Sequence, residues 1–88
     1  MDVIDYPIDG VLDLHMFSPK DAGSVVDEYL RACHEKRILE VRIIHGKGKG
    51  VLRRTLHALL ERHPLVREYH FDPGPSSWGA TVVKLRSD

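Results

Sequence analysis

The chain has 88 residues, enough for one small domain and too few for two ordinary ones. Apolar residues make up 42% and charged residues 30%, a balance typical of a globular domain rather than a disordered segment. A single cysteine excludes a disulfide within the chain, and no apolar stretch approaches the roughly 20 residues of a membrane-spanning helix. Because no charged segment followed by an apolar run opens the sequence, we expect a cytoplasmic protein with no membrane partner.

The formal net charge is zero, but the charges are unevenly distributed along the chain. Residues 1–33 hold seven acidic and two basic residues, residues 34–67 three acidic and nine basic, and residues 68–88 three acidic and two basic. Because local potential rather than net charge attracts a polyanion, the basic middle segment keeps nucleic acid among the candidate partners. The alternative is a solvated helix face that carries Lys and Arg without binding anything.

Two segments precede the first predicted helix. Residues 1–10 contain proline and glycine and show no sustained periodicity, so we expect an N-terminal arm there and one domain over residues 11–88. From Val11 to His15 apolar and polar residues alternate, which is the pattern of a strand with one face on a core.

The first helix is predicted to begin at Ser18-Pro19, where a capping hydroxyl is followed by a proline at the first helical position. It is expected to end near residues 36–37, where cations suit the negative end of the helix dipole. Its apolar stripe recurs at three- and four-residue steps and consists of Ala22, Val25, Val26, Tyr29, Leu30 and Cys33.

A second strand is predicted over Glu40–His45, because the segment is short, β-branched and apolar on both faces. A glycine-rich turn over residues 46–50 leads directly into a second amphipathic helix, which ends before Pro64. Residues 66–71 and 80–85 are strand-like and are joined by a segment of turn formers, which predicts a terminal hairpin.

The predicted order is therefore βαβαββ. Two right-handed crossovers place both helices on one face of the sheet, so we expect an α/β two-layer sandwich with a mixed four-stranded sheet. In such a sheet the carboxyl ends of the first two strands share one edge, and His15 and His45 should lie near each other there.

The glycine-rich turn is the first candidate site. Glycines between a buried strand and a helix N-terminus let the backbone approach a phosphate, and nearby cations add charge that a plain turn does not need. The spacing matches neither a nucleotide-binding P-loop nor a dinucleotide fingerprint, and the alternative is a tight turn with no ligand. The candidate phosphate-binding residues are Gly46, Lys47, Gly48, Lys49, Gly50, Arg53 and Arg54.

Asp13 and His15 form the second candidate site. Two residues apart on a strand, their side chains should leave the same face, where a carboxylate can orient an imidazole for general base catalysis. With His45 they could also hold a divalent metal such as Mg²⁺ or Mn²⁺. The alternative is a hydrogen-bonding Asp13 that caps a loop beside a structural histidine.

Four other polar residues, Ser18, His34, His57 and His63, are interpreted as structural, because none has a partner at catalytic or metal-binding spacing. Trp78 could stack on a base or close the hairpin over the core.

The sequence resembles the small MutS-related (Smr) domain family. The resemblance rests on Leu-Asp-Leu-His at 12–15, on Ile-Ile-His-Gly-Lys-Gly-Lys-Gly-Val-Leu-Arg at 43–53, on His-Pro-Leu-Val at 63–66 and on Gly-Ala-Thr-Val-Val-Lys-Leu at 79–85. It departs from the family pattern where Met16-Phe17 stand in place of a glycine, and where Ser76-Ser77-Trp78-Gly79 replace a glycine-rich motif.

The resemblance implies a fold like the C-terminal domain of bacterial translation initiation factor three and binding to DNA or RNA. In some family members it also implies a DNA-nicking or RNA-cleaving endonuclease activity. Carried over by motif, Asp13, His15 and His45 become the candidate catalytic residues. A non-catalytic nucleic-acid-binding module and a protein-interaction module remain the alternatives.

Overall fold

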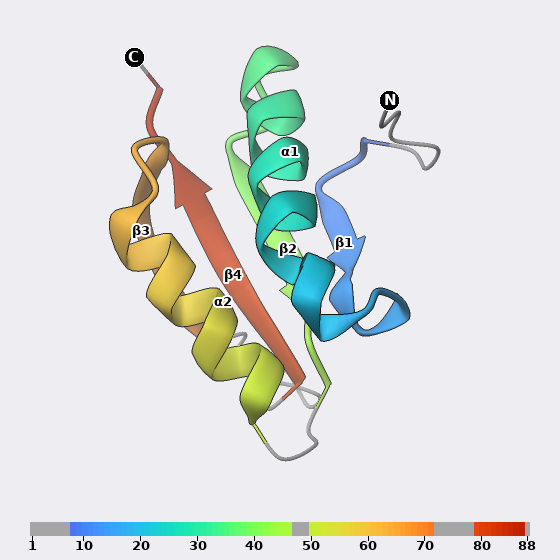
Figure 1. Cartoon of the computed structure of the whole chain (residues 1–88). Helices are drawn as coiled ribbons and strands as arrows, with labels where there is room; N and C mark the ends of the chain where they lie inside the picture. The colour runs from blue at the N-terminus through green and yellow to red at the C-terminus, as the bar shows by residue number, and fades with distance from the viewer. Residues whose placement is uncertain (1–7, 47–49, 72–78, 88) are drawn as a thin grey trace.

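The computed structural model describes residues 8–46, 50–71 and 79–87. In the described part of the chain, two helices lie side by side across one face of a four-stranded sheet (Figure 1). The predicted two-layer α/β sandwich is confirmed. The elements, in chain order, are β1 (Val11–Asp13), α1 (Ala22–Glu35), β2 (Glu40–Ile44), α2 (Val51–Arg62), β3 (Val66–Phe71) and β4 (Ala80–Leu85).

The sheet order is β1-β2-β4-β3. β1 and β2 are parallel, and β4 is antiparallel to both of its neighbours, so β3 runs in the same direction as β1 and β2. The terminal hairpin is confirmed, and its second strand occupies the position between β2 and β3. Strands β1 and β3 therefore form the two edges of the sheet.

Alternation along the two central strands separates the core from the open face. On β2, Val41 and Ile43 are fully buried, and on β4 Val83 is fully buried as well. Next to these residues in the chain, Glu40 and Lys84 point away from the helices and form a 3.7 Å ion pair. The helix-facing residues of β2 and β4 meet the apolar stripes of α1 and α2 in one core.

The predicted stripe of α1 is confirmed, since all its members are buried except Val25, which is partly buried against the core. The predicted cap differs in detail. Ser18 makes no side-chain capping bond, and a 3₁₀ turn over Pro19–Asp21 precedes the α-helix at Ala22. Proline fits such a tight first turn because its ring fixes φ and it has no N–H to lose.

The first strand is shorter than predicted. It ends at Asp13, and the chain turns at once into a 3₁₀ helix over Leu14–Met16. This turn buries Leu14 completely, leaves Met16 74% exposed and packs Phe17 against the core. The alternation that suggested a longer strand therefore reflects a turn that directs two apolar side chains inward.

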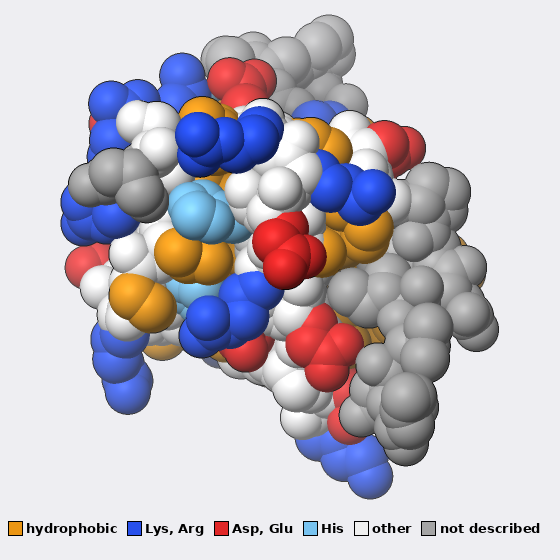
Figure 2. Space-filling view, turned by 90° about the horizontal axis from the view of Figure 1, so that it is seen from above, with side chains coloured by type: hydrophobic (Ala, Val, Ile, Leu, Met, Phe, Trp, Pro, Cys, Tyr) orange, Lys and Arg blue, Asp and Glu red, His pale blue; other side chains and the backbone are white. Residues whose placement is uncertain are grey.

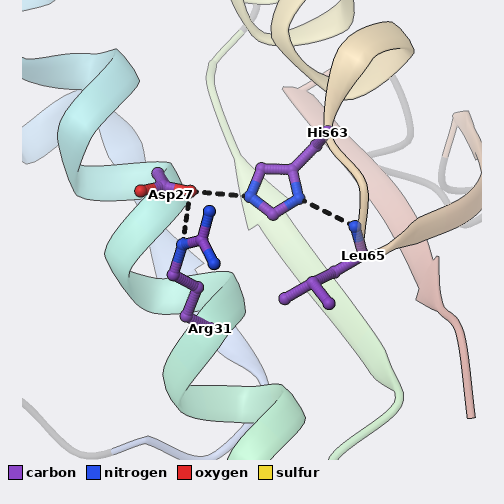
Figure 3. Close-up of polar contacts among 4 residues, drawn as sticks. All are labelled: Asp27, Arg31, His63 and Leu65. Atoms are coloured by element: carbon purple, nitrogen blue, oxygen red, sulfur yellow. Dashed lines mark hydrogen bonds and ion pairs between the residues drawn. The ribbon is translucent and has the colours of Figure 1, made fainter. Parts of the chain in front are cut away.

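A buried histidine links α1 to the corner between α2 and β3 (Figure 3). The Nδ1 atom of His63 accepts the backbone N–H of Leu65 at 3.2 Å, so Nε2 carries the proton and donates to Asp27 at 2.8 Å. Asp27 also accepts from Arg31 at 2.9 Å. Burial raises the pKa of the Asp27 carboxyl, but the bonds from His63 and Arg31 outweigh this, and the net pKa is lowered. His63 was interpreted as structural, and its partner Asp27 lies 36 residues away in the chain, where no sequence spacing indicated it.

We expect Asp27→Ala to lower the free energy of unfolding by about 1 to 2 kcal/mol, because it leaves the buried His63 N–H without its acceptor. Arg31→Ala, which removes only the exposed ion pair, should change it by less than about 0.5 kcal/mol. Urea denaturation of both variants checks this. Equal losses in the two variants would contradict a special role for the bond to His63.

No helix in the described ranges is both long enough and apolar enough to cross a membrane. The cytoplasmic location expected from the sequence stays a prediction.

Candidate nucleic-acid interface

The carboxyl ends of the parallel strands β1, β2 and β3 lie together at the bottom of Figure 1. We call this the carboxyl edge of the sheet; it runs across the ends of the strands and is distinct from the edge strands β1 and β3. Asp13, the last residue of β1, pairs with Ile44, the last residue of β2, and Ile44 pairs with Ala80, the first residue of β4. Phe71, the last residue of β3, pairs with Thr81. The predicted convergence of these chain segments is therefore confirmed for the backbone.

The turn after β2 is tied to the start of β4. The backbone N–H groups of His45 and Gly46 both donate to the carbonyl of Gly79, at 2.8 and 2.9 Å. Gly46 adopts a left-handed φ of +80°, and a Cβ at Gly79 would lie 3.6 Å from the Gly46 Cα. The Gly46 amide is thus engaged within the protein. Lys47, Gly48, Lys49 and Trp78 lie outside the described residues.

His45 lies beneath this turn and is only 4% exposed. Its Nδ1 lies 3.0 Å from the carbonyl oxygen of Gly46, which can only accept, so Nδ1 carries a proton. Its Nε2 lies 2.9 Å from the hydroxyl of Thr81. In the neutral imidazole Nε2 is an acceptor, and Thr81 therefore donates to it.

His57 joins the same network from α2. Its Nε2 lies 2.9 Å from the Thr81 hydroxyl, which has already donated its proton to His45 and so accepts from His57. His57 was interpreted as structural, and its bond to Thr81 gives it a structural role that the sequence did not specify. It flanks the apolar stripe beside Leu56 and Leu60, but no sequence signal pairs it with a threonine 24 residues away.

Both histidines are held in the neutral state. Burial lowers the pKa of His45, and the positive charge of Arg53 lowers it further, against an opposing hydrogen bond to Gly46. Burial also lowers the pKa of His57, with smaller contributions from His45 and Arg53. A lowered histidine pKa means that the unfolded chain binds protons more readily than the folded one.

The free energy of unfolding should therefore fall as the pH drops below about 6.5, the pKa of an unperturbed histidine. The carboxyl of Asp27, with its lowered pKa, contributes to such a loss only below about pH 4. The variant His57→Gln keeps an N–H donor for Thr81 but does not titrate. We expect its free energy of unfolding to fall less steeply with decreasing pH than that of the native protein. Thermal melts from pH 8 to pH 5 test this, and parallel curves for the two proteins would refute it.

Asp13 and His45 leave opposite faces of the sheet at this edge. Asp13 shares its register with Ile44 and so points away from the helices, whereas His45 points toward them. The premise that Asp13 and His15 alternate along one strand was wrong, because His15 lies in the 3₁₀ turn. The His15 side chain is outside what the structure describes. Among the side chains it does describe, no three His, Cys, Asp or Glu residues gather as potential metal ligands.

The N-terminus of α2 adds positive charge to the same edge. Gly50, with a left-handed φ of +83°, stands before the helix and supplies no side-chain cap. The first turn contains Arg53 and Arg54 and no acidic residue. Because the helix dipole makes its N-terminus positive, two guanidinium groups there are electrostatically unfavourable unless an anion is bound.

The opposite end of the domain has a different electrostatic setting. Figure 2 looks down on that end, where Lys and Arg side chains are spread with Asp and Glu among them. The C-termini of both helices lie there, with Lys36 and Arg37 following α1 and Arg62 closing α2. Helix dipoles stabilise cations at C-termini, so these basic residues need no ligand.

The chain is thus a small two-layer α/β domain. Its candidate site lies where the parallel strands β1, β2 and β3 end and where α2 begins with Arg53 and Arg54. The model of the Smr domain family matches residues 12–86, and the chain belongs to that family. Among curated relatives, the proteins named Endonuclease MutS2 from Clostridium tetani and Caldicellulosiruptor saccharolyticus are 35% and 39% identical over 80 residues. Those residues are 90% of this chain but 10% of each relative, so the chain spans about a tenth of their length.

Two solved structures have the same fold. The Smr domain of Thermus thermophilus MutS2 is 32% identical, with a TM-score of 0.82 over 89% of this chain and 99% of that one. YdaL, a stand-alone small MutS-related protein from Escherichia coli, is 25% identical, with a TM-score of 0.81 over 93% of this chain and 68% of that one. The family and the fold expected from the sequence are confirmed.

Proposed function

We propose that this domain binds the phosphate backbone of nucleic acid at the carboxyl edge of its sheet. The observation that carries the proposal is the N-terminus of α2, where Arg53 and Arg54 stand without an acidic neighbour in the first turn. Helix N-terminal amides and guanidinium groups both match phosphate oxygens. The names of the MutS2 relatives, which are endonucleases, support a nucleic-acid ligand.

The glycine-rich segment before α2 extends this surface in the proposal. Lys47 and Lys49 add two positive charges, and Gly48 and Gly50 let the backbone approach the ligand closely. Because the Gly46 amide already donates to Gly79, its part is to shape the turn rather than to bind phosphate. Such contacts are independent of sequence and weaken with salt.

We further propose phosphodiester cleavage at this edge, with Asp13 and His15 as the reacting pair. The Asp13 carboxylate orients the imidazole, and the imidazole takes a proton from water. The water oxygen then bonds to phosphorus, the bond from phosphorus to the leaving sugar oxygen breaks, and that oxygen takes up a proton, which leaves the imidazole neutral again. His45 acts as a positioning residue, because both of its ring nitrogens are engaged within the protein and it holds the turn at Gly46.

Binding and cleavage are tested separately with the purified protein. Fluorescence anisotropy with labelled duplex DNA, single-stranded DNA and structured RNA should show binding that weakens as salt is raised from 50 to 200 mM. Nicked-plasmid and RNA substrates, with and without magnesium or manganese, test cleavage and metal dependence. Binding without cleavage would favour the non-catalytic module, a reading that the engaged nitrogens of His45 also favour. No binding to any of these probes would refute the proposal.

A further inference from the structure

An exposed aromatic ring lies beside the basic helix N-terminus. Phe71 ends the edge strand β3 and is 48% exposed. Its pairing with Thr81 places its side chain on the helix-facing side of the sheet, at the edge where the strands end. Among described residues, Val11, Met16 and Val51 are also large, apolar and exposed. Val11 and Met16 lie on and just after β1, at the other side of the sheet, whereas Val51 is the first residue of α2, two residues before Arg53. Phe71 is therefore separate from Val11 and Met16, and its aromatic ring lies at the end of the domain where α2 begins.

The inner side of this ring is held in place by α2. The ring centroid of His57 lies 5.3 Å from that of Phe71, and the Arg53 guanidinium carbon lies over the ring at 5.8 Å from its centroid. Tyr69 packs on His57 at 4.9 Å and donates its hydroxyl to Glu61 at 2.6 Å. These neighbours thus fix the position of the Phe71 ring, while about half of its surface remains exposed to solvent.

We propose that Phe71 is a stacking platform for an unpaired base of a bound nucleic acid. The inference rests on the proposed function and narrows its ligand to a single-stranded or locally opened strand. Away from its ends, a duplex keeps its base faces within the stack, so along a strand only an unpaired base can cover the ring. Arg53 connects the proposed phosphate site with the aromatic ring, since it lies in the first turn of α2 and over Phe71. A phosphate bound by Arg53 and a base on Phe71 then belong to the same or an adjacent nucleotide.

The charge of the neighbourhood favours a base over an apolar protein partner. An exposed ring alone would suit either ligand, but this ring is bordered by Arg53, with Arg54 next along the helix and no acid in that first turn. Burying a guanidinium group under an apolar surface is costly, whereas a polyanion pairs with it.

The test compares single-stranded and duplex oligonucleotides of equal length, each with one 2-aminopurine. We expect Phe71→Ala to weaken single-strand binding by about 5- to 150-fold, the range for loss of one stacked base, and to change duplex binding by less than about twofold. The 2-aminopurine emission of the single strand should drop on binding the native protein and not on binding the variant. Phe71→Tyr, which keeps the ring, should restore both properties.

Val11→Ala is the matched control, since Val11 is 46% exposed and lies on the opposite edge strand. It should change neither affinity. Two results would refute the stacking site while the proposed function stands, provided that the native protein binds nucleic acid. In the first, Phe71→Ala binds the single strand as tightly as the native protein does. In the second, Phe71→Ala loses affinity for the duplex and for the single strand equally. If the native protein binds neither the single strand nor the duplex at 50 mM salt, the stacking site and the proposed nucleic-acid binding are both refuted.

Discussion

Asp13→Asn is expected to lower the rate of phosphodiester cleavage by about 10²- to 10⁴-fold, the range typical of losing acid–base assistance. The amide keeps the shape of the carboxylate and one acceptor oxygen, but it lacks the charge that orients and activates an imidazole. Affinity for the same substrate should stay within about twofold, because phosphate binding is assigned to α2 and the turn before it. Single-turnover cleavage and anisotropy on one substrate measure the two quantities separately.

The competing explanation for Asp13 is a structural cap, and it predicts a different result. Asp13→Asn would then lower the melting temperature, and any loss of cleavage would follow the unfolded fraction. Glu40→Gln is a suitable control, because this carboxylate begins β2 at the other end of the same sheet. It should leave cleavage unchanged. A cleavage rate for Asp13→Asn equal to that of the native protein would remove Asp13 from the reacting pair.

Replacing Lys47, Lys49, Arg53 and Arg54 together by alanine should weaken binding to duplex DNA by about 10²-fold at 50 mM salt. Each cation that contacts a phosphate contributes about 0.9 to the slope of log affinity against log salt, so that slope should become shallower by up to about 3.6. The loss should be nearly the same for different sequences, because phosphate contacts carry no sequence information.

A change in net charge alone must be separated from the loss of a site. The double variant Arg53→Ala/Arg54→Ala can be compared with Lys36→Ala/Arg67→Ala, which removes the same charge from the opposite end of the domain. The first pair should flatten the salt dependence and the second should not. Equal effects would show that the protein attracts nucleic acid through its overall charge, without a localised interface.

Several features follow from the sequence alone, because they depend on local periodicity and on the handedness of connections. The three- and four-residue spacing from Ala22 to Cys33 predicted the buried face of α1, and β-branched residues predicted β2. Right-handed crossovers bring both helices to one face and the strand ends to one edge, which is enough to place Asp13 near the turn at Gly46. The motifs at residues 12–15 and 43–53 were enough to indicate the family.

Other features were decided only by tertiary structure, because they depend on contacts between residues far apart in the chain. The strand order is set by long-range pairing, which inserts β4 between β2 and β3 and thereby brings Thr81 to His45. The packing of α2 on this sheet then adds His57 to the same hydroxyl. Periodicity reports which face of an element is apolar, but a polar residue at the margin of that face can meet water or a buried partner. Only the packed structure shows which residue has which surroundings. It removes water from one side of His57, and it leaves the neighbouring Phe71 ring exposed to solvent.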